Sequence, residues 1–327
     1  MLRKLTLAVA LVAGTIYPVR ASATTSPTHI DHVFVYVLEN TSYSDVVGNP
    51  QAPYLNSLTK QFVLATNYTA TGHESLDNYI AMTSGQRPNP LTMADCPIYG
   101  TPLCIMNVKN IGDQLEAKHF TWKGYMDSMP GPCTHSKENS QEQFSSPYAT
   151  RHNPFMYYSD IVDNVPRCDA HDVPLTDLWN DQAAGTVPNY SFITPNTCHD
   201  AHDSGSSCDA GGGIHEADVF ASETIPKILA DPSWTNGGLL VVTFDEGATG
   251  AEKPSITLNN VDFGGHVYTL LAYPGAVGGR RVGTRFDHYS LLRTTEDIFC
   301  LPHLAGAALS STISMLPAIG GKRCAPL

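Results

Sequence analysis

The sequence predicts an α/β fold built around a mostly parallel β-sheet. β-Branched and aromatic runs alternate along the 327 residues with segments of helical periodicity, which is the pattern of strands connected through helices. These runs are apolar throughout rather than at every second residue, as in parallel strands that are buried on both faces. No internal repeat or low-complexity linker divides the chain, so we expect a single domain over residues 24–327.

The first half of the chain opens with the clearest predicted strand, the continuous apolar run HVFVYVL. Further on, Leu76, Tyr79 and Ile80 follow the i, i+3, i+4 spacing of a helix face, which predicts a short helix that begins at Ser75. The predicted elements are, in order, a strand at 32–38, a helix at 53–61, a strand within 61–68, the helix from Ser75, and a helix followed by a strand within 111–127.

The second half begins with a segment, 128–175, that is rich in Pro, Ser, Asn and Cys. This composition favours loops, and we expect a long excursion from the sheet. Regular patterns then return, with strands at 190–194, 237–247 and 266–275 and helices at 216–231 and 288–299.

The first 23 residues have the features of a secretory signal peptide. A basic start is followed by an apolar run over 5–17 and by the small residues Ala21-Ser22-Ala23 as a cleavage site. The apolar run is too short to span a bilayer comfortably, and no later stretch has the length of a membrane helix. We therefore expect a secreted or periplasmic protein without a transmembrane segment.

Eight cysteines lie after the predicted signal, and an even number in an exported chain favours disulfide bonds. Pairing nearest neighbours is the simplest hypothesis among about 105 connectivities. It gives the bonds Cys96–Cys104, Cys133–Cys168, Cys198–Cys208 and Cys300–Cys324.

The chain carries a formal net charge of −12 and has no basic cluster. This composition argues against nucleic acid as the main partner. An acidic protein that binds a phosphate anion needs local positive charge, and a bound cation would supply it.

Oxygen-bearing side chains follow two of the predicted buried strands. Glu39 and Asn40 end the first strand, and Asp245 and Glu246 end the strand at 237–247. Ligands in open α/β sheets bind beyond the carboxyl ends of the strands, and an all-oxygen set suits Ca²⁺, Mg²⁺ or Mn²⁺, with zinc as an alternative. The competing interpretation is that these residues are solvated or cap the next helix.

Histidines supply a second group of candidate site residues. In the segment HDAHD, Asp200 and His202 could form a more nitrogen-rich metal position together with His266. The alternative is an exposed polar loop held by a Cys198–Cys208 bond. Three further histidines are candidates for substrate contact, although each has a structural interpretation as well, namely His73, His152 and His288.

Ser75 is the candidate nucleophile. At a helix start the unpaired backbone N–H groups and the positive end of the dipole favour an anion. The alternative is that Ser75 is an N-cap residue.

Six segments in order resemble the phosphoesterase family, which holds secreted acid phosphatases and bacterial phospholipases C and belongs to the alkaline-phosphatase-like superfamily. The resemblance runs from about residue 30 to 305. The segments are VLENTSY (37–43), HESLDNYIAMTSG (73–85), HNPF (152–155), FITPNTCHDAHD (192–203), VVTFDEG (241–247) and HYSLLRTTEDIFCLP (288–302).

The resemblance implies a doubly wound α/β fold with helices on both faces and a metal-assisted hydrolysis of phosphate esters. The family's metal-binding Glu-Asn and acidic pairs fall on Glu39-Asn40 and Asp245-Glu246, and its Ser-x-x-Asn-Tyr motif falls on Ser75, Asn78 and Tyr79. Its Asp-x-His loop falls on Asp200 and His202. We expect Ser75 to be activated by the metal and Asn78 to stabilise the phosphoryl oxygens, with His202 or His266 as a further contact.

Two residues depart from the family pattern. Glu74 and Asp77 stand where many relatives have proline, and negative charge beside the nucleophile opposes phosphate binding unless it points away.

The chain lacks the C-terminal extensions of the longer phospholipases, which favours an acid phosphatase over a phospholipase C or phosphodiesterase. The substrate would be a small phosphate ester or a phospholipid head group. An exported protein that binds phosphate or sugar without turnover is the alternative from another class.

Overall fold

A computed structural model describes residues 29–99, 101, 104–136, 147–206, 208–248 and 264–321. The predicted signal peptide, residues 1–23, lies outside the described residues. No helix in the part of the chain that is described has the length and apolar character needed to cross a membrane.

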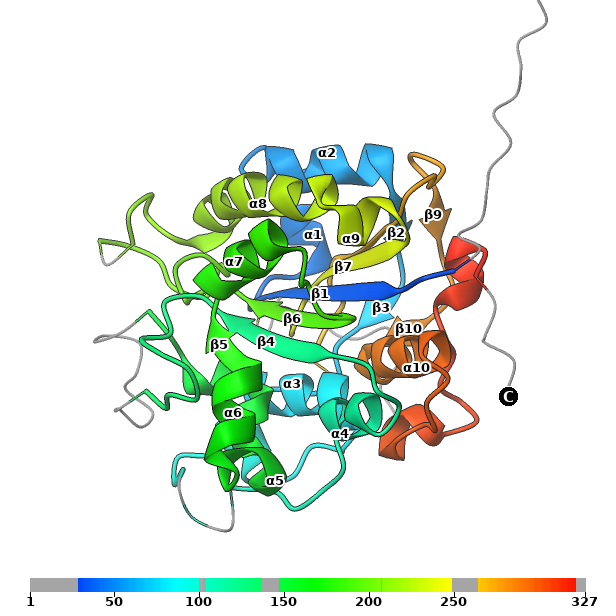
Figure 1. The fold of residues 1–327 in the computed structure, drawn as a ribbon. Helices are drawn as coiled ribbons and strands as arrows, with labels where there is room; N and C mark the ends of the chain where they lie inside the picture. Colours follow the sequence, from blue (N-terminus) through cyan, green and yellow to red (C-terminus); the bar gives the residue numbers. More distant parts are fainter. Residues whose placement is uncertain are drawn as a thin grey trace, which may run out of the picture.

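The core of the molecule is an eight-stranded sheet in the order β5-β4-β6-β1-β7-β8-β2-β9 (Figure 1). β8 is antiparallel to both of its neighbours, and the other neighbouring pairs are parallel. The predicted mostly parallel sheet is therefore confirmed. Its strands are β1 (His32–Leu38), β2 (Val63–Ala65), β4 (Trp122–Met126), β5 (Asp172–Pro174), β6 (Tyr190–Thr194), β7 (Gly238–Phe244), β8 (Thr269–Ala272) and β9 (Arg281–Val282).

Helices cover both faces of this sheet, as expected for a doubly wound fold (Figure 1). The layer drawn above the sheet holds α1 (Tyr43–Val46), α2 (Pro53–Gln61), α7 (Thr176–Ala184), α8 (Gly213–Ala230) and α9 (Pro232–Thr235). The layer below holds α3 (Ser75–Ser84), α4 (Ile111–Glu116), α5 (Ser159–Val162), α6 (Val165–His171) and α10 (His288–Ile298). A separate two-stranded sheet pairs β3 (Tyr68–Thr69) with β10 (Phe286–Asp287).

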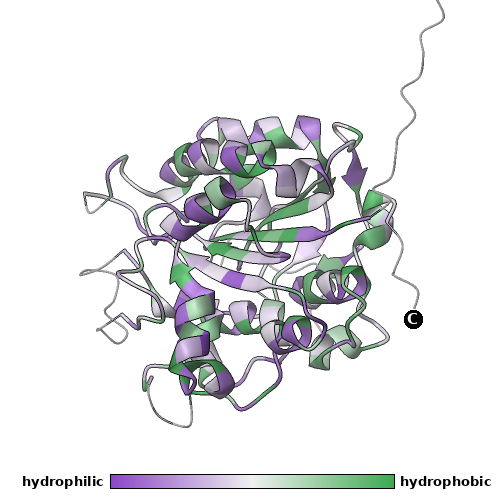
Figure 2. Cartoon of the chain, in the orientation of Figure 1, coloured by the Kyte–Doolittle hydropathy of each residue, from purple (hydrophilic) through white to green (hydrophobic). Residues whose placement is uncertain are grey.

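The central strands are buried along their whole length. Every residue of β7 is buried, and in β1 only His32 is partly exposed. Figure 2 shows the same division, with hydrophobic strands in the middle and hydrophilic residues on the helices around them. Burial on both faces explains why the sequence of these strands is apolar without alternation.

The segment 128–175 is more regular than predicted. It contains the short helices η3 (Thr150–His152) and η4 (Pro154–Tyr157) as well as α5, α6 and β5. Proline lies in the first turn of η4 and of α6, where its fixed φ favours a helix start. The same residues that suggested loops therefore begin helices.

Helix α7 was not predicted at all. Leu178 is its one fully buried residue, so the apolar periodicity that reveals an amphipathic helix is too sparse in this segment.

Three of the predicted disulfide bonds are present, Cys96–Cys104, Cys133–Cys168 and Cys198–Cys208. The fourth predicted pair includes Cys324, which lies outside the described residues. The first and third bonds close short loops of the chain, and both loops lead to residues of the site described below.

Helix α10 contains a buried carboxyl group that predicts pH-dependent stability. Glu296 is fully buried and accepts a hydrogen bond from the Leu304 N–H at 2.7 Å. Burial raises the pKa of Glu296 to about 8. Because the pKa of Glu296 is higher in the folded than in the unfolded protein, the protonated carboxyl group favours the folded state. This contribution to stability is complete below the unfolded-state pKa and is lost as the pH rises through the folded-state pKa.

We therefore expect Glu296→Gln to become more stable relative to the wild type as the pH increases from about 5 to about 8. The gain in the free energy of unfolding should be about 1.4 kcal/mol for each unit by which burial raises the pKa. Urea unfolding of both proteins at the two pH values measures it. The same stability difference at both pH values would show that Glu296 does not ionise in this range.

Candidate active site

The ends of the two central strands bring four polar side chains to one place. β1 and β7 are parallel neighbours with Leu38 paired to Phe244, so the residues that follow them lie side by side. The backbone N–H of Asn40 donates a hydrogen bond to Asp245 Oδ1 at 3.0 Å. Glu39, Asp245 and Glu246 are all buried.

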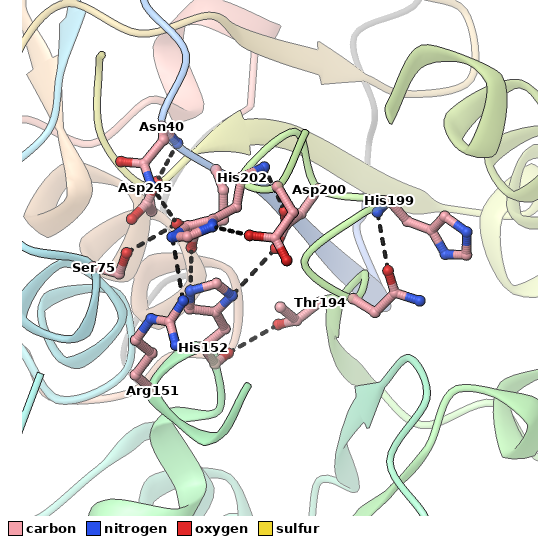
Figure 3. Close-up of polar contacts among 12 residues, drawn as sticks. Asn40, Ser75, Arg151, His152, Thr194, His199, Asp200, His202 and Asp245 are labelled. Atoms are coloured by element: carbon pink, nitrogen blue, oxygen red, sulfur yellow. Dashed lines mark hydrogen bonds and ion pairs between the residues drawn. The ribbon is translucent and has the colours of Figure 1, made fainter. Parts of the chain in front are cut away.

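Helix α3 directs its first turn at Glu39. Ser75 is the first residue of the helix, and its Oγ donates a hydrogen bond to Glu39 Oε2 at 2.9 Å. One turn later the hydroxyl of Tyr79 donates to Glu39 Oε1 at 2.6 Å, since residues four apart share a helix face. The candidate nucleophile is thus fixed against the carboxylate that ends β1 (Figure 3).

The loop after β6 closes the site from the other side. The backbone N–H of Glu39 donates to the carbonyl oxygen of Asp200 at 2.7 Å. The imidazole of His152 lies between two carboxylates, with Nδ1 3.2 Å from Asp200 Oδ2 and Nε2 3.4 Å from Glu39 Oε1 (Figure 3). His152 is buried and its ring stacks on Tyr79 with 5.5 Å between centroids.

His202 joins the same group. Its Nδ1 is 2.8 Å from Asp203 Oδ1, and its Nε2 is 3.2 Å from a terminal nitrogen of Arg151. Ligand atoms of Glu39, His152 and His202 lie within 4.8 Å of one another. Separated segments of the chain therefore converge around Ser75.

The electrostatics of this cluster are unfavourable for carboxylates alone. Burial, followed by the charges of Asp245 and Asp200, raises the pKa of Glu39 well above its usual range. Burial also raises the pKa of Asp200 strongly and that of Asp245 to about 7. Conversely, burial and the positive charges of Arg151 and His202 lower the pKa of His152.

A bound cation fits these residues. Buried carboxylates repel one another unless positive charge lies between them, and Asp245 Oδ2 is buried without a hydrogen-bond partner among the described residues. The strand-end donors are mostly oxygens, the choice of hard divalent ions, whereas His152 and His202 add nitrogens on one side. The ion would be held by some or all of Glu39, Asn40, Ser75, Asp200, Asp245 and Glu246.

Asn78, the candidate for contact with phosphoryl oxygens, is hydrogen-bonded to the loop that precedes Ser75. Its Oδ1 accepts hydrogen bonds from Thr71 N, Thr71 Oγ1 and Gly72 N at 2.9–3.1 Å. Its Nδ2 donates to the carbonyl oxygens of Gly72 and Glu74. Both ends of the amide are hydrogen-bonded to residues 71–74, so Asn78 braces the loop that precedes Ser75.

His288, a candidate for substrate contact, has both ring nitrogens hydrogen-bonded within the protein. Its Nε2 donates to the backbone carbonyl oxygen of Asp245 at 2.5 Å, and its Nδ1 accepts from the Tyr68 hydroxyl at 3.1 Å. Burial lowers the pKa of His288 to about 4, in keeping with a neutral ring that uses one nitrogen as donor and one as acceptor. His288 thus supports the backbone at Asp245, directly after β7.

The two remaining candidate histidines, His266 and His73, lie in different surroundings. His266 stacks on the ring of Tyr43 with 4.2 Å between centroids, and we leave it out of the proposed site. His73 contacts the carboxylate of Glu246 through Nδ1, which places it beside a proposed metal ligand.

The two acidic residues that depart from the family pattern, Glu74 and Asp77, differ in their exposure to solvent. Glu74 is exposed, whereas Asp77 is buried in the first turn of α3. Burial, and then the charge of Asp245, raises the pKa of Asp77 to about 8. A protonated Asp77 adds no negative charge beside the nucleophile, so this position does not oppose phosphate binding at acidic pH.

Sequence reasoning did not identify Asp95 or Arg151 as residues that shape the site. It placed Tyr79 in the motif of Ser75 but did not identify it as a hydrogen-bond partner of Glu39. Tyr79 could have been found, because it lies one helical turn after Ser75. The sequence around Asp95 and Arg151 gives little indication of a site. Cys96 follows Asp95, and the HNPF segment follows Arg151.

A model of the Phosphoesterase family matches residues 49–302. The chain belongs to the Phosphoesterase family. The matched residues include the helix of Ser75, the segment of His152 and the ends of β6 and β7. The family match thus agrees with five of the six motifs that carry the resemblance, whereas VLENTSY (37–43) lies before the matched residues.

Among named relatives, a probable acid phosphatase of Kluyveromyces lactis is 30% identical over 272 residues. The alignment covers 83% of this chain but 58% of that protein, so this phosphoesterase spans little more than half of the yeast protein's length. A phosphatidylinositol-3-phosphatase of Mycobacterium tuberculosis is 29% identical over 289 residues, which are 88% of this chain and 83% of the mycobacterial protein.

Solved structures confirm the fold class. A Vibrio parahaemolyticus protein of the alkaline phosphatase superfamily superposes with a TM-score of 0.57 over 85% of this chain and 68% of its own. The sequence identity is 13%, so this similarity shows a shared alkaline-phosphatase-like fold and carries no statement about substrate.

Proposed function

We propose that this phosphoesterase is a secreted, metal-dependent acid phosphatase that cleaves phosphate monoesters through a phosphoserine intermediate. The observation that carries the proposal is the Ser75 Oγ–Glu39 Oε2 hydrogen bond of 2.9 Å at the start of α3. It joins a buried serine to a cluster of buried acids that fits a cation. The similarity to proteins named as phosphatases supports the choice of monoesters.

The side chains of the chain account for the first step. Ser75 donates its proton to the hydrogen bond with Glu39, which leaves an oxygen lone pair facing the substrate. As Oγ attacks phosphorus, Glu39 takes the hydroxyl proton and the bond from phosphorus to the ester oxygen breaks in line. The ester oxygen leaves with the bonding electron pair and takes up a proton from water, and a phosphoserine forms. A divalent ion bound by these residues would lower the pKa of the serine hydroxyl and neutralise charge on the phosphoryl group. Water then hydrolyses the phosphoserine.

The surrounding residues position and protect this chemistry. Tyr79 and His152 hold the second oxygen of Glu39, and Asn78 fixes the loop before the nucleophile. Ser75 is 2% exposed and Glu39 is fully buried, and a buried site strengthens electrostatic interactions with the reacting group. The disulfide bonds and the predicted signal peptide together favour an oxidising location outside the cytoplasm.

Chelation and metal add-back test this function directly. We expect the purified protein to hydrolyse 4-nitrophenyl phosphate, to lose this activity after dialysis against EDTA, and to regain it with Ca²⁺, Mg²⁺ or Mn²⁺, or with Zn²⁺ if the nitrogen ligands take part. Elemental analysis before and after dialysis shows which ion leaves. Full activity in protein shown to be metal-free would contradict the metal dependence. A metal-loaded protein that hydrolyses no phosphate ester would favour a non-catalytic binding protein.

A further inference from the structure

Arg151 places a positive charge on the wall of the active site. It belongs to η3, directly before His152, and is 9% exposed. Its charge opposes the high pKa of both Glu39 and Asp200, so its field reaches the acids on two sides of the site.

Contacts with Asp95 and His202 are among those that hold the guanidinium group. Its Nε lies 3.7 Å from Asp95 Oδ2. One terminal nitrogen lies 3.2 Å from His202 Nε2 (Figure 3). Asp95 is itself fixed, because its Oδ1 accepts a hydrogen bond from the backbone N–H of Leu76 at 2.9 Å. The next residue, Cys96, is bonded to Cys104, which limits the movement of this loop.

These contacts form a closed circuit around the nucleophile. Leu76, which follows Ser75, binds Asp95, and Asp95 pairs with Arg151. Arg151 contacts His202, whose ligand atom lies within 4.8 Å of a carboxylate oxygen of Glu39, and Glu39 accepts the hydrogen bond of Ser75. A phosphorus atom attacked by Ser75 must lie within about 3.5 Å of Oγ. Arg151 therefore belongs to a chain of contacts that begins and ends at the first turn of α3, where that phosphorus atom is attacked.

A guanidinium group is well suited to this position. Its planar fork of N–H donors matches two oxygens of a phosphoryl group, and it stays charged at every pH at which the protein is folded. A phosphate monoester presents three nonbridging oxygens that share up to two negative charges, whereas a diester presents two that share one. A fixed cation therefore gains more from the monoester.

On the basis of the proposed phosphatase function, we propose that Arg151 binds nonbridging oxygens of the substrate phosphoryl group and sets a preference for monoesters over diesters. Asp95 is a positioning residue in this arrangement. It orients the guanidinium group before substrate arrives, and such preorganisation is what makes fixed charges effective in active sites.

Paired substrates test this preference. We expect Arg151→Met to lower kcat/KM for 4-nitrophenyl phosphate by about 10²-fold and for bis(4-nitrophenyl) phosphate by less than about 10-fold. Arg151→Lys retains the charge without the fork, so its loss should be intermediate. Binding of inorganic phosphate, measured by calorimetry on metal-loaded protein, should weaken in parallel with the monoester loss.

Arg167→Met is the matched control. Arg167 is also largely buried, but it pairs with Asp113, Glu116 and Asp160 in the layer of α4 and α6. We expect its loss to lower the melting temperature without changing the ratio of the two substrates. Asp95→Asn keeps an acceptor for Leu76 and removes the charge beside Arg151, so it should shift the ratio in the same direction as Arg151→Lys.

Several outcomes would overturn the role of Arg151. An equal loss for both substrates would assign Arg151 to general folding or positioning, and an unchanged phosphate affinity would remove it from the phosphoryl site. If Arg151→Met does not fold, Arg151→Lys and Asp95→Asn supply the same comparison. If the wild type hydrolyses neither ester, the proposed function fails, whereas the calorimetric comparison still decides whether Arg151 binds phosphate.

Discussion

Ser75→Ala is expected to lower the rate of phosphate-ester hydrolysis by at least ~10³-fold, the scale of a lost nucleophile. The reason lies in the geometry of α3, which places Oγ at the first residue of the helix and 2.9 Å from Glu39 Oε2. Alanine removes the attacking atom and leaves the rest of the pocket in place. Steady-state hydrolysis of 4-nitrophenyl phosphate measures the loss.

The same variant separates covalent catalysis from simple activation of water. If a phosphoserine forms, acid-quenched wild-type protein should carry a phosphoryl group that intact-mass analysis detects, and Ser75→Ala should carry none. Ser84→Ala is the control, since Ser84 is another buried serine of α3 and its Oγ donates to Ile80 O at 3.1 Å, away from Glu39. Near-wild-type turnover by Ser75→Ala would refute the assignment of the nucleophile.

The place of this candidate nucleophile could be predicted because its signals are local. The apolar runs of β1 and β7 show where each strand ends, and the proposed ligands Glu39 and Asp245 follow directly. The helix of Ser75 has a short apolar stripe, and the structure begins α3 at that residue. Because the carboxyl ends of neighbouring parallel strands lie side by side, the residues that follow these strands are expected to be close together even when their side-chain contacts are unknown.

The direction in which a side chain points could not be predicted in the same way. Asn78 and His288 have the polar chemistry of site residues, but one braces a loop and the other supports the backbone of Asp245. Each contact depends on the path of a segment that is distant in sequence. Asp95 and Arg151 were missed for the same reason, since they meet only after α3, η3 and the Cys96–Cys104 loop have packed together.

Glu39→Gln should produce the second large effect, because Glu39 connects most of the site. One carboxylate accepts from Ser75 at Oε2 and from Tyr79 at Oε1, and Oε1 also lies 3.4 Å from His152 Nε2. An amide keeps the shape but replaces one acceptor with a donor and removes the charge that attracts a cation. We expect activity to fall by at least ~10³-fold, together with a loss of bound metal in elemental analysis.

Stability provides a readout of Glu39→Gln that does not depend on turnover. Burial and the neighbouring acids raise the pKa of Glu39, so ionised Glu39 destabilises the metal-free fold at neutral pH. Metal-free Glu39→Gln should therefore melt at a higher temperature than metal-free wild type, while added metal should stabilise the wild type more than the variant. Glu296→Gln, which changes another fully buried glutamate far along α10, should retain both metal and activity. If Glu39→Gln binds metal as tightly as the wild type, Glu39 is not a ligand, and the cation must be held by the residues that follow β7 and β6.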